Sequence, residues 1–183
     1  MSRTAGRDAA DTRRQIIDAA ITLIAQHGSG VAVADIAREA GVSKGGLLYH
    51  FASKDALLEA VARALFDDFR NAVYDAAAGD AAAGSLTRAY IRVSFADGTD
   101  PEHMRKMIAV AAQLMNIDAL QQLGDADGVR WRDELMADGL DPATVRLVIA
   151  ATDGVSSAPL WGTLLNSHDQ RALEAQLLSL ATP

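Results

Sequence analysis

The apolar positions between residues 33 and 51 follow two short helical patterns that meet at a glycine. The apolar residues at helical spacing in the first pattern are Val33, Ile36, Ala37 and Ala40. Gly41 comes next, where a left-handed backbone is easy for glycine, and Ser43 is a residue type that caps helix N-termini. The sequence therefore predicts helices over residues 33–40 and 44–51 joined by a tight turn. This arrangement is typical of a helix-turn-helix, whose second helix enters the major groove of DNA.

The second of these helices has two contrasting faces. Turning each residue by about 100° places Leu47, Leu48 and Phe51 on one side, which we assign to the core. An interior glycine costs a helix about 1 kcal/mol relative to alanine, so two glycines on the side opposite the core need an explanation. Bare backbone near a helix N-terminus permits close approach to a phosphate or a groove wall, which favours a DNA-facing role for this side. The residues expected to face DNA are Ser43, Lys44, Gly45, Gly46, Tyr49 and His50.

The rest of the chain also has helical patterns. Helices are predicted at about residues 53–78, 86–95, 101–115, 128–137, 142–165 and 170–180. Two of them begin with an Asp-Pro pair, at Asp100-Pro101 and Asp141-Pro142, in which an N-cap precedes a proline at the first helical position. Half of the residues are apolar and 5% are aromatic, which favours helices over strands. The predicted fold class is all-α.

The charge is unevenly distributed along the chain. The net charge is −7, which is unusual for a DNA-binding protein. Residues 1–56 hold seven Lys and Arg against six acids, whereas residues 57–183 hold ten against eighteen. An acidic C-terminal part would repel DNA everywhere except at the N-terminal part. The basic side chains expected to reach phosphates there are Arg3, Arg7, Arg13, Arg14 and Lys54.

Residues 12–61 resemble the DNA-binding domain of the TetR family of transcriptional regulators. The motifs that carry the resemblance are Gln26-His27-Gly28, Asp35-Ile36-Ala37, Ala40-Gly41-Val42-Ser43-Lys44-Gly45 and Ser53-Lys54. The resemblance implies an all-helical homodimer with a three-helix DNA-binding domain, here residues 1–54. It also implies a larger helical domain, here residues 55–183, that binds a small molecule and dimerises. Lys54 matches the family's phosphate-contacting lysine.

The sequence departs from the family pattern at three positions. Ala32 lies where the family usually has Thr or Ser, and Ala34 lies where a longer polar side chain often reaches DNA. Leu48 occupies the usual tyrosine position, and Tyr49 follows one residue later. We therefore expect direct base contacts from Lys44, Tyr49 and His50, with DNA shape supplying part of the specificity.

The resemblance implies an effector pocket in the C-terminal domain. The candidate lining residues are Phe66, Phe69, Tyr90, Met104, Met107, Met115, Trp131 and Trp161. Methionines and aromatic residues adapt to apolar ligands, although methionines at helical spacing are more often plain core. His103 and Arg105 are candidate polar anchors.

The two C-terminal helical segments are the expected dimer interface. Residues 142–165 contain only two charged side chains, Arg146 and Asp153, so this helix must be buried nearly all round. Small residues such as Gly154 and Gly162 permit a second helix to approach closely, and residues 170–180 add leucines. Burial inside one subunit is the alternative.

Other chemistries have little support in the sequence. The chain lacks cysteine, its four histidines are scattered, and it has no phosphate-binding glycine loop, so we expect no enzyme activity, metal or cofactor. We see no secretory signal and no apolar run of about 18 residues, which predicts a cytoplasmic protein without a membrane partner. The predicted function is a sequence-specific repressor released from a double-stranded operator by a small molecule. A constitutive DNA-binding protein and an activator are the alternatives.

Overall fold

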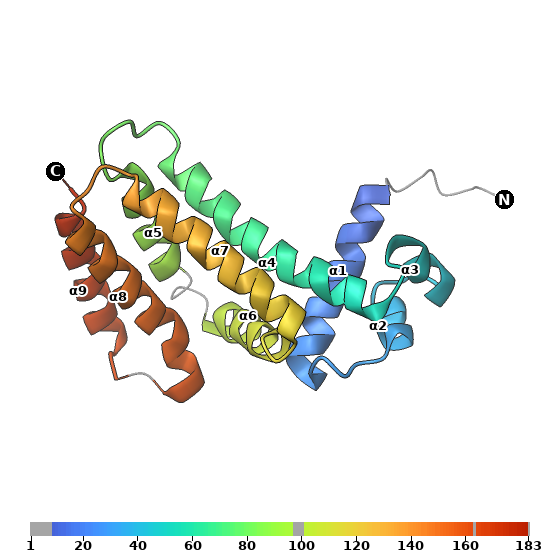
Figure 1. Cartoon of the computed structure of the whole chain (residues 1–183). Coiled ribbons are helices and arrows are strands. Elements are labelled where there is room, and N and C mark those ends of the chain that lie inside the picture. The colour runs from blue at the N-terminus through green and yellow to red at the C-terminus, as the bar shows by residue number, and fades with distance from the viewer. Residues whose placement is uncertain (1–8, 97–100, 163, 183) are drawn as a thin grey trace.

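The computed structural model describes residues 9–96, 101–162 and 164–182, without the side chains of residues 96, 101–105 and 159–161. All the regular structure in this part of the chain is helical, as predicted (Figure 1). The helices are α1 (Ala9–His27), α2 (Val33–Glu39), α3 (Lys44–His50), α4 (Lys54–Ala77), α5 (Ser85–Ala96), α6 (Pro101–Leu114), α7 (Asp118–Met136), α8 (Pro142–Trp161) and α9 (Ser167–Leu180). Figure 1 shows α1–α3 at one end of an elongated molecule, α8 and α9 at the other, and α4 running between them. Within the described residues, no helix combines the length and apolar character needed to cross a bilayer.

Local signals set the boundaries of the helix-turn-helix. Gly41 has a φ of +66°, which ends α2 in the left-handed region expected from the sequence. The Ser43 hydroxyl accepts a hydrogen bond from the backbone N–H of Gly46 at 2.9 Å, and so caps α3. The Ser53 hydroxyl caps α4 in the same way, with the N–H of Ala56 at 3.0 Å. The predicted helix–turn–helix is confirmed.

The core of the N-terminal end continues into α6. The fully buried side chains of α1–α3 pack with Val110 and Leu114 of α6 and with Leu120 of α7. Helix α6 lies against α1 as well as against α4. A change in the position of α6 would therefore act directly on α1, which packs against the helix-turn-helix.

A buried arginine joins α4 to α7. Arg70 of α4 is 5% exposed, and its guanidinium donates to Asp127 at 2.7 Å and to Glu134 at 3.0 Å. Its Cζ lies 4.2 Å from the centroid of the Trp131 ring, and Tyr74 donates its hydroxyl proton to Glu134 at 2.6 Å. Burial alone would lower the pKa of Arg70, but hydrogen bonds to Asp127 and Tyr74 raise it above its ordinary value. The guanidinium is thus held charged between the two helices.

Helix α7 begins ten residues earlier than the sequence predicts. It starts at Asp118 rather than at residue 128 and runs through Gly124 and Gly128. A Cβ added to Gly124 would lie 3.2 Å from the Met115 side chain, so this glycine permits close packing. Tertiary packing and the Arg70–Asp127 contact outweigh the low helix propensity of the glycines.

Helix α8 ends earlier than predicted, and α9 begins earlier. Gly162 has a φ of +92°, which stops α8 at Trp161 instead of residue 165. The Asn166 side chain caps α9, and the backbone N–H of Asn166 donates a hydrogen bond to the Asp169 carboxylate, which completes a capping box. The Asp141 cap predicted for α8 is present, whereas the cap predicted at Asp100 lies outside the described residues.

A side-chain hydrogen bond joins the first turn of α5 to the residue that follows α9. Arg88 is 7% exposed and donates to the backbone carbonyl oxygens of Ala83 and Ala181, at 2.8 and 2.7 Å. It also pairs with Asp80 at 2.6 Å. Gly84, with a φ of +80°, lies so close that an added Cβ would be 2.7 Å from the Ala181 oxygen. Gly84 and Ala181, about a hundred positions apart in the sequence, therefore pack so closely that no side chain fits between them.

Candidate nucleic-acid interface and ligand cavity

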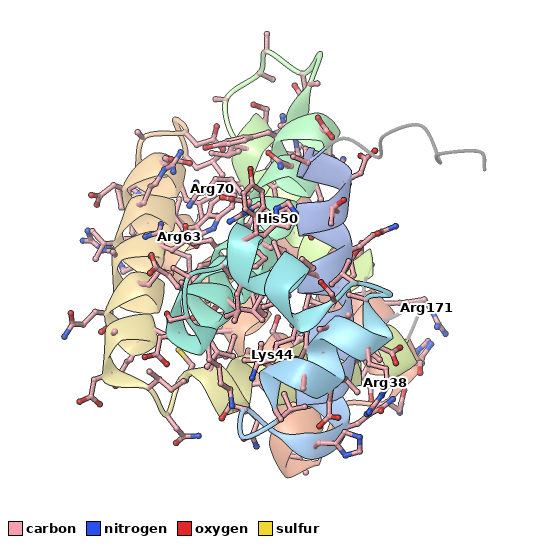
Figure 2. The ribbon with its side chains drawn as sticks, turned by 90° about the vertical axis from the view of Figure 1, so that its right-hand side faces the viewer. Arg38, Lys44, His50, Arg63, Arg70 and Arg171 are labelled. Atoms are coloured by element: carbon pink, nitrogen blue, oxygen red, sulfur yellow. The ribbon has the colours of Figure 1, made fainter. Side chains whose placement is uncertain are left out.

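Helix α3 presents its polar and glycine-bearing side to solvent. Leu47 and Phe51 are buried, at 0% and 3% exposure, and fix α3 to the core. Lys44 and Gly45 are exposed, Gly46 and His50 are half-buried, and Tyr49 is 83% exposed. Figure 2 views the molecule from this end, with Lys44 and His50 at the two ends of α3. The rings of Tyr49 and His50 meet edge to face, with their centroids 5.4 Å apart.

The predicted burial of Leu48 is wrong. Its side chain is 41% exposed and lies on the same open surface as Tyr49. Helix α3 is seven residues long and packs against α2, and Leu47 and Phe51 already fill the space beneath it. A residue 100° around the helix from Leu47 is therefore left at the edge of the contact. The exposed surface of α3 thus includes an aliphatic side chain that the sequence interpretation had assigned to the core.

The basic residues around α3 differ in burial and in the side-chain contacts that they already make. Lys54 opens α4 directly after the Ser53 cap and is half-buried. Arg13 stacks over the Phe51 ring, with 4.9 Å between its Cζ and the centroid. Arg14, which the sequence interpretation expects to reach a phosphate, pairs in this structure with Asp18 at 3.0 Å and Asp68 at 2.8 Å. The hydrogen bond to Asp68 raises the pKa of Arg14 above its ordinary value. Arg3 and Arg7 lie outside the described residues.

Comparisons with known proteins agree with this geometry. The family profile described as "Bacterial regulatory proteins, tetR family" matches residues 16–61, and the profile "Tetracyclin repressor-like, C-terminal domain" matches residues 84–182. The chain belongs to the TetR family of transcriptional regulators. These profiles cover the helix-turn-helix and most of the larger helical part. The Ala32, Ala34 and Leu48 departures are therefore variations within a TetR DNA-binding region.

Individual relatives are similar over most of the chain. The regulator BetI of Burkholderia thailandensis is 33% identical over 141 residues, covering 73% of this chain and 72% of BetI. BetI of Agrobacterium fabrum is 33% identical over 127 residues, or 68% of this chain, and the match spans 62% of that protein's length. The multidrug binding protein EbrR, in a crystal structure with malachite green, is 28% identical with a TM-score of 0.71. That match covers 93% of this chain and 98% of EbrR.

A cavity of about 580 Å³ lies between α1, α4, α5 and α6. Three of the predicted ligand-lining residues, Phe66, Phe69 and Met107, form part of its wall. The other apolar residues of the wall are Ile21, Leu65, Ala72, Val93, Ile108 and Ala111. The contribution of α1 was not expected, because the inner face of α1 has the same apolar pattern as any core helix.

Three other predicted lining residues, Tyr90, Trp131 and Met115, lie outside the cavity wall. Tyr90 and Trp131 pack beside Phe69, with ring centroids 5.6 and 5.7 Å from it, in a core cluster behind the cavity. Burial raises the pKa of the Tyr90 hydroxyl. Met115 packs against Gly124. The side chains of Met104 and Trp161, and of the expected anchors His103 and Arg105, are outside the described part of the structure.

Polar groups from α1, α4 and α6 complete the cavity wall. At the solvent-facing rim, Arg14 donates two hydrogen bonds to Asp68, at 3.0 and 2.8 Å, and one to Asp18. Lys106 of α6 is half-buried, and its ammonium donates to the Thr22 hydroxyl at 3.0 Å. Lys106 and Thr22 are functional candidates that the sequence interpretation missed, because they lie 84 positions apart.

A shallow apolar hollow of about 430 Å³ marks the outer side of α8 and α9. Its lining includes Gly154, Val155, Gly162 and Leu173. Nearby, Leu147 and Leu164 are 51% and 101% exposed. Exposed leucines beside small residues are unusual on the surface of a lone subunit and are typical of a protein–protein contact. The alternative that α8 is enclosed within one subunit does not hold on this side of the helix.

Proposed function

We propose that this protein is a sequence-specific transcriptional repressor that a small-molecule effector releases from its DNA operator. The observation that carries the proposal is the open surface of α3, in a chain that belongs to a family of transcriptional regulators. This surface offers a lysine, a tyrosine, a histidine and two glycines on the side opposite the core. The protein acts in the cytoplasm, where bacterial DNA lies.

Each exposed residue of the DNA-binding surface has a chemical role in this proposal. Lys44 donates to base or phosphate oxygens, and Tyr49 and His50 contact base edges. The backbone at Gly45 and Gly46 lets the helix approach the groove closely, with Ser43 holding the first turn. Leu48 offers an apolar contact for a thymine methyl group. Lys54 binds a phosphate at the start of α4, and so sets affinity rather than sequence preference.

The proposed repressor is a homodimer formed by α8 and α9. The exposed leucines and the hollow between the two helices are buried when the same surface of a second subunit packs against them. A two-fold axis through this interface places one α3 in each of two half-sites of a palindromic operator, one helical turn of DNA or more apart. The short recognition helix of one chain then reads only half of the site.

The cavity between α1 and α6 favours a ligand-controlled regulator over a constitutive one. Its volume is in the range of about 300–1,000 Å³ that holds small molecules. The EbrR complex with malachite green supports the view that a related fold binds a small molecule. In this proposal residues 1–54 form the DNA-binding domain, and residues 55–183 form the domain that dimerises and binds the effector. The effector shifts the dimer towards a head spacing that no longer fits both half-sites, by as much as its affinity for the two states differs.

Binding-site selection from random duplex DNA tests the proposal. We expect the purified protein to enrich one two-fold-symmetric sequence, and light scattering to give the mass of two chains. Tyr49→Ala should lose this enrichment while keeping the helical circular dichroism spectrum. Weak, salt-sensitive binding to all sequences, without enrichment, would overturn the assignment as a sequence-specific regulator.

A further inference from the structure

The cavity between α1, α4, α5 and α6 contains a cation in contact with a neutral partner. The Lys106 ammonium donates to the Thr22 hydroxyl at 3.0 Å, and none of the ion pairs among the described side chains includes Lys106. A carboxylate adds the attraction between opposite charges to such a hydrogen bond, which a neutral hydroxyl cannot supply, so it is the stronger acceptor for an ammonium. A carboxylate that reaches Lys106 would therefore displace the hydroxyl from it.

The acids at the same cavity have a partner already. Asp18 and Asp68 both accept hydrogen bonds from Arg14, at 3.0 Å and at 3.0 and 2.8 Å. The side chains of Arg14, Asp18 and Asp68 are exposed and form the rim of the cavity. Lys106 is less exposed than these three and is flanked by apolar residues of the wall. An organic cation entering the cavity would have to displace Arg14 and would meet Lys106 as a like charge. The electrostatics of the cavity favour an anion.

The walls of the cavity define the rest of the ligand. Phe66 and Phe69 of α4 and Met107 of α6 border the cavity together with aliphatic residues of α1 and α5. Such apolar walls recover the free energy of burying hydrocarbon, and a polar group buried against them without a hydrogen bond would cost free energy. A ligand that fits has one anionic group and an apolar remainder.

We propose that the effector is an amphiphilic carboxylate, with its head group on Lys106 and its hydrocarbon part between Phe66, Phe69 and Met107. This inference rests on the proposed effector-controlled function and names the ligand class for it. The same contact explains how binding reaches the DNA-binding region. Lys106 belongs to α6 and Thr22 to α1, so transfer of the ammonium from the hydroxyl to the carboxylate removes a hydrogen bond that holds α1 to α6.

Calorimetric titration of the DNA-free protein tests the ligand class. The probes are decanoate, decanol and the cation malachite green, each below any micelle-forming concentration. We expect decanoate to bind more tightly than decanol by about tenfold or more, because of one hydrogen bond between charged groups. Octanoate should bind about fifteenfold more weakly than decanoate, since each buried methylene contributes about fourfold. Equal binding of decanol and decanoate, or tighter binding of malachite green, would overturn the inference.

Variants of Lys106 and Thr22 test the two contacts separately. Lys106→Met should reduce decanoate affinity about tenfold or more and leave decanol affinity unchanged, whereas Lys106→Arg should retain decanoate binding. Thr22→Val should bind decanoate at least as tightly as the wild type, because the competing hydroxyl is gone. If Lys106→Met leaves the preference for decanoate over decanol unchanged, Lys106 does not bind the head group. The probe comparison on the wild type does not depend on the folding of any variant.

Release of the selected operator separates this inference from the proposed function. Decanoate should dissociate the protein–DNA complex of the wild type, and should do so less effectively with Thr22→Val, whose α1–α6 hydrogen bond is already missing. Release by a neutral or cationic compound but not by decanoate would contradict the ligand class and leave the repressor assignment standing. Decanoate binding through Lys106 in a protein that selects no operator would contradict the assignment and leave the binding site standing.

Discussion

Replacing Arg70 by Met should destabilise the protein more than any other single loss of charge between α4 and α7. The arginine side chain is 6% exposed, and the carboxylates of Asp127 and Glu134 that it neutralises are 19% and 27% exposed. Methionine keeps much of the aliphatic volume but leaves both carboxylates without this cation. Burial opposes the ionisation of Glu134, yet hydrogen bonds from Tyr74 and Arg130 hold its pKa below the ordinary value, so it stays ionised.

The magnitude follows from the burial of the pair. Removing one member of a buried ion pair costs about 3–5 kcal/mol, and the partial exposure of both acids argues for the lower end, about 3 kcal/mol. With an m-value of about 2 kcal/mol/M in urea, the unfolding midpoint should fall by about 1.5 M. Arg63→Met is the matched control, because Arg63 forms an exposed pair with Glu59 one turn away on α4, with side chains 57% and 50% exposed (Figure 2). Its loss should cost about 0.3–0.5 kcal/mol.

The assay is urea unfolding followed by circular dichroism at one fixed protein concentration, since the proposed dimerisation would make the midpoint concentration-dependent. The Arg70→Met deficit should shrink as the pH falls and Glu134 takes up a proton, because an acid with a lowered pKa loses its stabilising contribution in that direction. Adding Glu134→Gln to Arg70→Met should recover part of the loss. A midpoint change no larger than that of Arg63→Met would refute the view that Arg70 holds α4 to α7.

Four further predictions concern the DNA surface and the rest of the fold. Tyr49→Ala should weaken operator binding by about 1–3 kcal/mol and leave non-specific binding unchanged, and an unaltered operator affinity in a gel-shift titration would remove Tyr49 from the base-reading set. Lys54→Gln should weaken binding to all sequences alike and reduce the slope of log affinity against log salt by about one; an unchanged slope would count against the phosphate contact. Gly84→Ala should lower the melting temperature strongly, since its Cβ would lie 2.7 Å from the Ala181 oxygen at a φ of +80°, and Gly79→Ala, which has open space, is the comparison for φ strain alone. Burial raises the pKa of Asp153 above its ordinary value, so the ionised carboxylate opposes folding and stability falls as the pH rises through the range in which this carboxyl ionises. Asp153→Asn should therefore raise the melting temperature at about pH 7 but not below about pH 4, and a difference that persists in acid would contradict this cause.

Short-range signals made much of this fold predictable. The Gly41 turn and the Ser43, Ser53 and Asp141 caps each depend on a few neighbouring residues, and the structure contains all four. The helical wheel for α3 correctly separated Leu47 from Tyr49, at 0% and 83% exposure.

Features that depend on distant parts of the chain were not predictable in this way. Leu48 is exposed because no other helix extends over it, which its own helix does not encode. The first half of α7 is helical despite Gly124 because Met115 packs against that glycine. The Lys106–Thr22 contact joins α6 to α1 across 84 positions. Periodicity alone treats such residues as ordinary members of a helix.

The contact between Arg88 and Ala181 also bears on the order in which parts of the protein can fold during synthesis. Domains generally fold as units during synthesis, with the N-terminal one first. The cluster that supports the helix-turn-helix includes residues only as far as Leu123, so all of them are present when about two-thirds of this sequence has left the ribosome. Arg88 has no Ala181 carbonyl to bind until synthesis reaches that residue. The residues that pack beneath the helix-turn-helix are therefore all available to fold before the surface proposed for dimerisation is finished, which requires that α9 has been made. A nascent chain can present its recognition helix before it can pair with a second subunit.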